Sequence, residues 1–475
     1  MSSLLSGIAP TADRRRRILV LALPIVGGMA SQNVLNLVDT AMVGTLGDEA
    51  LAAVGLGGIS NFLLTSFVLG LSAGVQATAA RRVGQGRDSE TALPLNGGLV
   101  IALSVAIPWS VALWFMVPSL FPLLVDDPAV YEQGIPYLQA RLLAMVAMGM
   151  NFCFRGYWNA TDRSALYMKT LVVMHVTNVF LNCILIYGPG PYPTPTFFGV
   201  PFDLLGPWVG PVVDLFGIPR LGAEGAGLAS ASATWAGAIT YIYLGFRHAR
   251  SGGFLRALPS RETILGMVRL SLPNSIQTAF YAGGMVAFYV LTGMVGTREL
   301  AAANVIINLL LVGVLPGIGF GFAGMSLVGQ ALGRGEPEDA MRWGWDVAKM
   351  AGMVVFLIAI PGMIAPHFIL GFFLHDPETL RVAELPLRMV SFFLAFDAMG
   401  MVFLNCLLGA GATRSVMVIS VTLQWFFFLP LVALVGPVLK WGLVAIYGAN
   451  ILYRAIQTGL FATIWKRGQW AEIEV

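Results

Sequence analysis

The chain has 475 residues, of which 57% are hydrophobic and 11% charged, with a formal net charge of +3 and a mean hydropathy of +0.77. A soluble globular domain carries roughly 25% charged residues, so this composition excludes a water-soluble protein. The small net charge gives no indication of a nucleic-acid partner. We therefore expect an integral membrane protein.

Twelve segments are long and apolar enough to span a membrane as helices, each of which needs about 20 residues. The fold class predicted is therefore all-α and polytopic. The second and eighth segments are long and rich in glycine, so we expect each to be tilted or bent. The outer connection from Gly188 to Leu221 is predicted to be irregular because it is rich in proline and glycine. The predicted spans are 18–43, 51–80, 93–118, 135–158, 165–187, 223–246, 264–292, 300–331, 346–372, 386–409, 415–436 and 441–465.

The basic residues are distributed unevenly between the two sides of these helices. With the N-terminus inside, the inner segments carry 20 Lys and Arg and the outer segments carry five, while Arg141, Arg155 and Arg454 lie within apolar spans. Basic loops stay in the cytoplasm, so both termini are predicted to be cytoplasmic, in a bacterial inner membrane. Arg155 is expected to anchor its helix at the cytoplasmic interface. The first apolar run has no small-residue cleavage pattern, so the first helix is expected to stay in the mature chain.

An internal repeat relates the two halves of the chain at an offset of 249 residues. "LALPIVGGM" aligns with "LSLPNSIQT", which matches Pro24 with Pro273, and "GTLGDEALAAV" then meets "GMVGTRELAAA". Six spans separate each repeat from its copy, so the halves have the same orientation and a pseudo-two-fold axis along the membrane normal, with a cavity between them. The predicted parts are an N-lobe (1–246), a cytoplasmic linker (247–262) and a C-lobe (263–475).

Two acids lie inside predicted spans, Asp39 in the first and Asp397 in the tenth. A charge at that depth is expensive and usually faces a cavity or a partner. The repeat aligns Asp39 with Phe288 and Asp397 with Val146, so the shared fold requires neither acid. Desolvation disfavours the carboxylate form, which allows Asp39 to exchange protons near neutral pH, whereas Na⁺ would favour the ionised form and gather oxygen ligands. The alternative is a structural hydrogen bond to a neighbouring helix.

Several motifs in order resemble the multidrug and toxic compound extrusion (MATE) family of cation-coupled antiporters. They are "LVDTAMVG", "RGYWNATDRS", "TNVFLNCILIYG", "GAEGAGLAS" and "LGAGATRS", and the likeness covers residues from about 14 to 467. The resemblance implies two six-helix bundles, with substrate leaving as Na⁺ or H⁺ enters.

The resemblance also implies roles for four residues of the N-lobe. Asp39 matches the coupling acid of the first helix, and Asn178, Asn182 and Ser230 match positions that complete a cation site. Some members carry a second acid at the position of Asn182 and threonine at that of Ser230. Asn178 and Asn182 are four residues apart and share a helix face, where they supply oxygens to an ion, hydrogen-bond to protonated Asp39, or join helices.

In the C-lobe, Asp397 matches an acid of the tenth helix, whereas Tyr281 stands where members often have glutamate. Arg454 precedes Lys466 by 12 residues, or ~18 Å along a helix, which is too deep for snorkelling. We hypothesise a buried Asp397–Arg454 ion pair, the alternative being two independent polar contacts. Pro24 removes a backbone hydrogen bond and is expected to act as a hinge in the first helix.

We therefore predict a secondary active transporter, a monomeric antiporter that exports organic-cation or amphiphilic compounds by alternating access. One alternative is a flippase for lipid-linked precursors, which would need several basic cavity residues, and Arg141, Arg155 and Arg454 are its only candidates. The other is a membrane-embedded enzyme or a subunit of a proton-moving complex. The sequence contains no phosphate-binding loop, no nucleophile with a base and no metal cluster, so we expect no enzyme and no cofactor beyond the coupling ion. Membrane lipids are the other expected partners.

Overall fold

The computed structural model describes residues 10–189, 196–197, 200–201, 213 and 215–473, and they are mainly helical. Two-residue strands β1 (Thr196–Phe197) and β2 (Val200–Pro201) pair antiparallel. Most of the predicted irregular outer connection lies outside the described residues. The helices are α2 (Ala12–Gly44), α3 (Asp48–Leu69), α4 (Leu71–Gly84), α5 (Leu93–Leu120), α6 (Pro128–Leu142), α7 (Met145–Ala160), α8 (Ser164–Tyr187), α10 (Gly222–His248), α11 (Arg261–Gly293), α12 (Thr297–Gly333), α13 (Pro337–Ile364), α14 (Pro366–Gly371), α15 (Pro377–Ala410), α16 (Thr413–Thr422), α17 (Leu429–Ala433) and α18 (Gly442–Arg467).

Within the described part of the chain, eight helical segments are long and apolar enough to cross a membrane, and the pair α6–α7, bent by 47°, is a ninth. Helices α10, α11 and α18, of 27, 33 and 26 residues, complete the twelve predicted spans. The second span passes from α3 to α4 at Gly70, whereas the eighth, α12, is one unbroken helix. The break within the fourth span was not predicted, because no proline or glycine marks residues 143–144.

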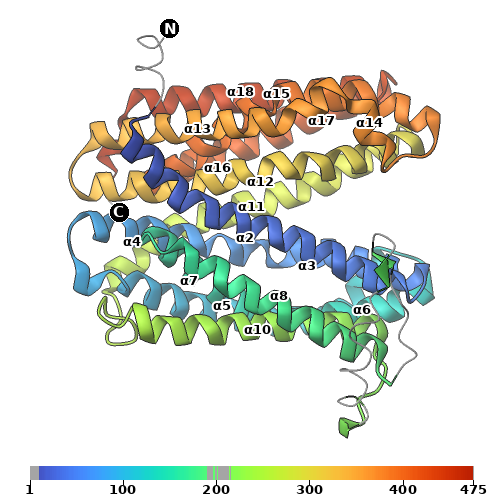
Figure 1. The fold of residues 1–475 in the computed structure, drawn as a ribbon, viewed down its shortest axis with the longest axis horizontal. Helices are drawn as coiled ribbons and strands as arrows, with labels where there is room; N and C mark the ends of the chain where they lie inside the picture. The colour runs from blue at the N-terminus through green and yellow to red at the C-terminus, as the bar shows by residue number, and fades with distance from the viewer. Residues whose placement is uncertain (1–9, 190–195, 198–199, 202–212, 214, 474–475) are drawn as a thin grey trace.

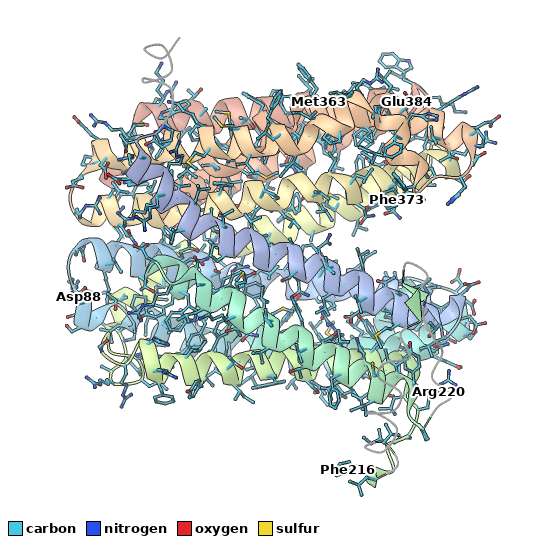
Figure 2. The ribbon with its side chains drawn as sticks, in the orientation of Figure 1. Asp88, Phe216, Arg220, Met363, Phe373 and Glu384 are labelled. Atoms are coloured by element: carbon cyan, nitrogen blue, oxygen red, sulfur yellow. The ribbon has the colours of Figure 1, made fainter. Side chains whose placement is uncertain are left out.

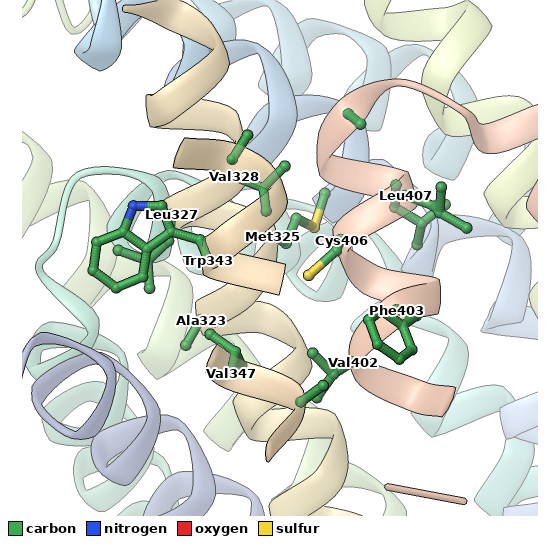
Figure 3. Packing of buried hydrophobic residues seen from close by; sticks show 14 of the residues in the cluster. Ala323, Met325, Leu327, Val328, Trp343, Val347, Val402, Phe403, Cys406 and Leu407 are labelled. Carbon is green, nitrogen blue, oxygen red and sulfur yellow. The ribbon is translucent and has the colours of Figure 1, made fainter. Parts of the chain in front are cut away.

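The helices form two bundles, with α3–α10 in one and α11–α18 in the other (Figure 1). One end of the molecule, at which helix α2 begins and helix α18 finishes, is called the basic end. Asp88 lies there, and Arg220, Phe373 and Glu384 lie at the opposite end (Figure 2). The bundles diverge toward that opposite end. The largest apolar cluster fills the second bundle, where residues of α12, α13 and α15, among them Met325, interlock (Figure 3).

Helix α2 belongs to both bundles. Its first half contributes Ile18 and Leu21 to the apolar cluster of the second bundle, and its last turn contributes Met42 to a cluster with α8 of the first. Helix α11 does the reverse, since Met267 packs in the first bundle and Phe288 in the second. The first helix of each repeat therefore crosses from one bundle to the other.

The segment predicted as a linker is fastened to the first bundle. The amide of Asn96 donates to the carbonyls of Gly253 (2.9 Å) and Ala257 (2.7 Å) and accepts from the amide of Leu255 (3.0 Å). Phe254 is fully buried beneath these bonds. The lobe boundaries themselves stay a prediction.

Candidate functional site

A cavity of about 770 Å³ lies on the inner side of the first bundle. Its walls come from α2, α3, α6, α7, α8 and α10, and Leu315 of α12 is the residue that closes it from the second bundle. Of the residues that carry a full charge at neutral pH, Asp39, Arg141 and Arg155 line it. The apolar lining includes Met29, Phe62, Met148, Phe152 and Met174, side chains that adapt to ligands of different shape.

The four residues predicted for the N-lobe site are joined in one chain of hydrogen bonds, and Asp39, Asn178 and Ser230 of this chain line the cavity. The Nδ2 of Asn182 donates to Asp39 Oδ1 (2.7 Å) and to Asn178 Oδ1 (3.0 Å). The Nδ2 of Asn178 donates in turn to Ser230 Oγ (3.1 Å). Asp39 is half-buried, while Asn178 and Asn182 are buried to 1% and 0% exposure. These hydrogen bonds, which we call the relay, connect Ser230 of α10 through Asn178 and Asn182 of α8 to the single carboxylate of Asp39 on α2.

The bond from Asn182 fits an ionised Asp39, because its amide donates to the carboxylate, whereas the amide of Asn178 donates away from Asp39, to Ser230. The Oδ1 of Asn182 is buried and has no hydrogen-bond partner among the described residues. An unpaired buried carbonyl costs about 1–3 kcal/mol, so it is ready to accept a partner. A cation beside Asp39, or a proton on Asp39 after an amide rotation, would provide one. No group of three or more His, Cys, Asp or Glu suited to a metal occurs in the described residues.

The structure also brings Asp397 and Arg454 together. Arg454 Nε lies 3.8 Å from Asp397 Oδ1, and the two side chains are 21% and 12% exposed. The guanidinium also donates to Gln457 (3.3 Å) and is hydrogen-bonded to Tyr281. The hypothesised pair is therefore formed, and Tyr281, at the position where the resemblance leads one to expect glutamate, contacts the arginine.

Of the three arginines that the sequence offered as basic cavity residues, Arg141 and Arg155 line the cavity, although Arg155 was expected at the interface. Arg155 does not extend to the interface expected for it, because its side chain lines the cavity. Its guanidinium lies 4.5 Å from the ring of Phe152 and 4.9 Å from that of Phe322. Arg141 lines the same cavity and is near enough for its charge to act on Asp39. Their position within apolar spans was the signal available in the sequence, since a buried charge usually faces a cavity.

At the basic end the two bundles are joined by a polar junction around Gln330 of α12. Its Nε2 donates to the carbonyl of Ala160 and to Asp162 Oδ1, both at 2.9 Å, and its Oε1 accepts from Arg17 (2.5 Å). Deeper in, Gln76 of α4 donates to Ser326 Oγ at 2.9 Å. These contacts close the cavity toward the basic end.

Beside this junction, α4 and α12 touch backbone to backbone through two glycines. A Cβ on Gly84 would lie 2.0 Å from the carbonyl oxygen of Gln330, and one on Gly333 would lie 2.2 Å from that of Arg81. No side-chain movement relieves a clash with backbone, so the closed basic end depends on these missing Cβ atoms.

We expect Gly84→Ala to open the basic end without unfolding either bundle. Overpacking destabilises the closed contact by about 1–3 kcal/mol. A thiol reagent should therefore label a cysteine placed at Ser326, which is 0% exposed in the wild type, about ten times faster. The measurement uses a background in which Cys153, Cys183 and Cys406 are serine. Gly266→Ala is the matched control, because nothing lies within 4 Å of its added Cβ. Equal labelling of both variants would contradict the prediction.

Arg14 holds the start of α2 against α13. It bonds Asp339 and Asp346, each at 2.6 Å. Burial acts to raise the pKa of Asp339, but hydrogen bonds from Arg14 and Trp343, with the charges of Arg14 and Arg334, hold this pKa below its usual range. A carboxyl with a lowered pKa stabilises the folded state above its unfolded pKa of about 4. This stabilisation is lost as the pH falls through the folded pKa.

We expect Asp339→Asn to lower thermal stability by about 1 kcal/mol near neutral pH, because the paired side chains are 20% and 29% exposed and partly screened. The difference from the wild type should be constant at neutral pH and shrink below about pH 4. Thermal unfolding of the purified protein between pH 3 and 7 measures it, with the exposed neighbour Glu338→Gln as control. A difference that grows with acidification would refute the assignment.

Two bundles of long apolar helices, with a cavity on the inner side of one and a hydrogen-bonded acid lining it, have the architecture of a membrane transporter. The family model described as MatE matches residues 24–184 and 273–434, more than half of the chain. The chain therefore belongs to the MatE family of multidrug efflux transporters, and it is not an enzyme. The two matched segments coincide with the two repeats.

Curated relatives and solved structures agree with this assignment. The chain is 25% identical to the probable multidrug resistance protein NorM of Pseudomonas aeruginosa, covering 92% of this chain and 86% of that protein. It is 24% identical to the NorM of Thermotoga maritima, covering 96% and 93%. A multidrug resistance MATE family transporter in an outward-facing conformation superposes with a TM-score of 0.83 at 18% identity, over 97% of both chains. A MATE crystal structure in complex with MaL6 gives 0.81 at 20% identity, over 96% of both chains. These structures share the predicted twelve-helix fold.

Proposed function

We propose that the protein exports organic-cation or amphiphilic compounds in exchange for H⁺ or Na⁺, with Asp39 as the coupling acid. The observation that carries this proposal is the relay from Ser230 through Asn178 and Asn182 to Asp39 in the wall of the cavity. A carboxylate that binds the ion and also lines the substrate cavity couples the binding of ion and substrate. Ion binding changes the affinity for substrate, and substrate binding changes the affinity for the ion by the same factor.

The residues give each form of Asp39 a set of partners. The ionised form accepts the Asn182 amide, and Na⁺ would add the free Oδ1 of Asn182 and the carboxylate as oxygen ligands. The protonated form donates to that same Oδ1 once the amide turns over. Either change redirects hydrogen bonds between α2 and α8, the contact that fixes the last half of α2 in the first bundle.

We further propose that the basic end faces the cytoplasm of a bacterial cell and that the protein works as a monomer. The predicted orientation places the arginines of the basic end inside the cell. The closed junction around Gln330 then blocks the inner side, and the cavity communicates with the outside. The match to NorM relatives favours this drug efflux over the flippase and proton-complex alternatives.

The test is transport of a fluorescent cation by the purified protein in liposomes, under an imposed pH gradient and separately under a Na⁺ gradient. Antiport predicts that the substrate accumulates against its own gradient when either the pH gradient or the Na⁺ gradient is imposed. The gradient that drives this accumulation identifies the coupling ion. Absence of accumulation under both, with the protein folded and oriented, would overturn the proposal.

Pro24 is proposed as the hinge of α2. It lies between Leu21, which packs in the second bundle, and Gly28, whose Cβ position would touch Tyr167 and Leu171 of the first. We expect Pro24→Ala to reduce gradient-driven transport several-fold while the melting temperature falls by no more than a few degrees, since alanine restores a helical hydrogen bond. Transport at the wild-type rate would remove the hinge from the mechanism.

A further inference from the structure

The charges that line the cavity are unusual for a site that takes only cations. Arg141 and Arg155 contribute two positive charges, and Asp39 contributes one negative charge when ionised. The sum is +1 with Asp39 ionised and +2 with Asp39 neutral. The net positive charge therefore makes a ligand that also carries a negative group a better electrostatic match for the cavity than a purely cationic ligand.

The two arginines differ in what balances them. Arg141 is close enough to Asp39 to interact with its charge. Arg155 has no such partner: its polar neighbours are the hydroxyls of Tyr167 and Tyr241, and no ion pair among the described residues includes it. Its Nε is buried without a hydrogen-bond partner in the described part of the chain. A largely buried guanidinium without an acidic partner is costly.

The surroundings of Arg155 hold the guanidinium in place without neutralising it. The rings of Phe152 and Phe322 lie 4.5 and 4.9 Å from its central carbon, and such contacts stabilise a cation without neutralising its charge. Tyr167 adds a hydrogen bond, which also leaves the charge in place. Phe152 belongs to α7 and Phe322 to α12, so the guanidinium lies where the two bundles meet. The side chain keeps part of its surface accessible, and it lines the cavity.

We propose that Arg155 is the recognition site for an anionic group of the substrate, so that the cavity prefers amphiphiles bearing a carboxylate over otherwise identical cations. The planar fork of arginine matches a carboxylate in two parallel hydrogen bonds. The carboxylate would supply the missing counter-ion, while the aromatic body of the ligand contacts the Met and Phe lining. This inference rests on the proposed function in taking the cavity as the substrate site.

The test compares tetramethylrhodamine, a zwitterion with a free carboxylate, with its methyl ester, a cation of nearly the same shape. Binding to the purified wild-type protein in detergent is followed by fluorescence polarisation. We expect the carboxylate form to bind about tenfold more tightly than the ester, as one charge-assisted hydrogen bond allows. Arg155→Met should abolish this preference, and Arg155→Lys should restore part of it. Equal binding of both dyes by the wild type, or a preference for the ester, would overturn the proposal.

Two further variants separate the explanations. Exposed Arg16→Gln removes a positive charge far from the cavity and should leave the preference unchanged. Arg141→Met should reduce it less than Arg155→Met does, and the reverse order would move the anion site to Arg141 and refute the assignment. The melting temperature of each variant reports folding. Binding in detergent needs no ion gradient, so a protein that binds as expected but fails to transport would refute the proposed antiport and leave this inference intact.

Discussion

Asp39→Asn is expected to abolish gradient-driven transport while the protein still folds and still binds substrate. Asparagine keeps the size of the side chain and its bond to α8, but it neither ionises nor holds a cation. Coupling between two ligands is typically worth about 1–3 kcal/mol, or 5–150-fold, so transport against a gradient should fall at least tenfold. The measurement is liposome transport under the gradient that drives the wild type, together with equilibrium binding in detergent.

A matched control for this variant is Asp48→Asn, which removes an exposed acid from the first turn of α3. It should transport at the wild-type rate. The wild type should also show a pH- or Na⁺-dependent affinity for substrate that Asp39→Asn lacks. If Asp39→Asn retained that dependence, another group would be the coupling site, and the relay through Asn182 would be structural.

Asp397→Asn should destabilise the protein more than any other single substitution considered above. The pair with Arg454 is largely buried, with a separation of 3.8 Å, and removing one partner of a buried pair costs about 3–5 kcal/mol because the other charge is left uncompensated. Arg454→Met should cost a similar amount. The double variant Asp397→Asn/Arg454→Met should recover most of the loss, since no isolated charge remains.

The double-mutant cycle is measured by thermal unfolding of the purified protein, with the exposed pair Glu384 and Arg388 as the comparison. That pair is 3.7 Å apart and its side chains are 35% and 52% exposed, so its coupling should be below about 1 kcal/mol. A coupling between Asp397 and Arg454 as small as that of the exposed pair would mean that the C-lobe acid is already satisfied by other groups.

The helices and the relay were predictable from the sequence for different reasons. Hydropathy located all twelve spans because lipid requires long apolar runs, although it placed the start of α13 at 346 rather than Pro337, since the first turns of that helix are charged. Asp39, Asn178, Asn182 and Ser230 were found through their polar character within apolar spans and through the family resemblance. Their roles in coupling stay predictions.

The features that the sequence did not predict depend on distances between segments far apart in the chain. The contact of Gly84 with Gln330 is an example, because a glycine near a helix end is usually explained by the local chain conformation. The aromatic surroundings of Arg155 are another, since Phe322 comes from the other half of the chain. Composition and helical periodicity describe one helix at a time and contain no information on which helices meet.

The crossing of α2 and α11 between the bundles has a consequence for the two halves of the chain. Each half completes its apolar interior with a piece of the other, through Ile18 in one direction and Met267 in the other. This arrangement resembles a domain swap made within one polypeptide. Neither half expressed alone is therefore expected to be stable, because each would expose the apolar surface that the other half covers.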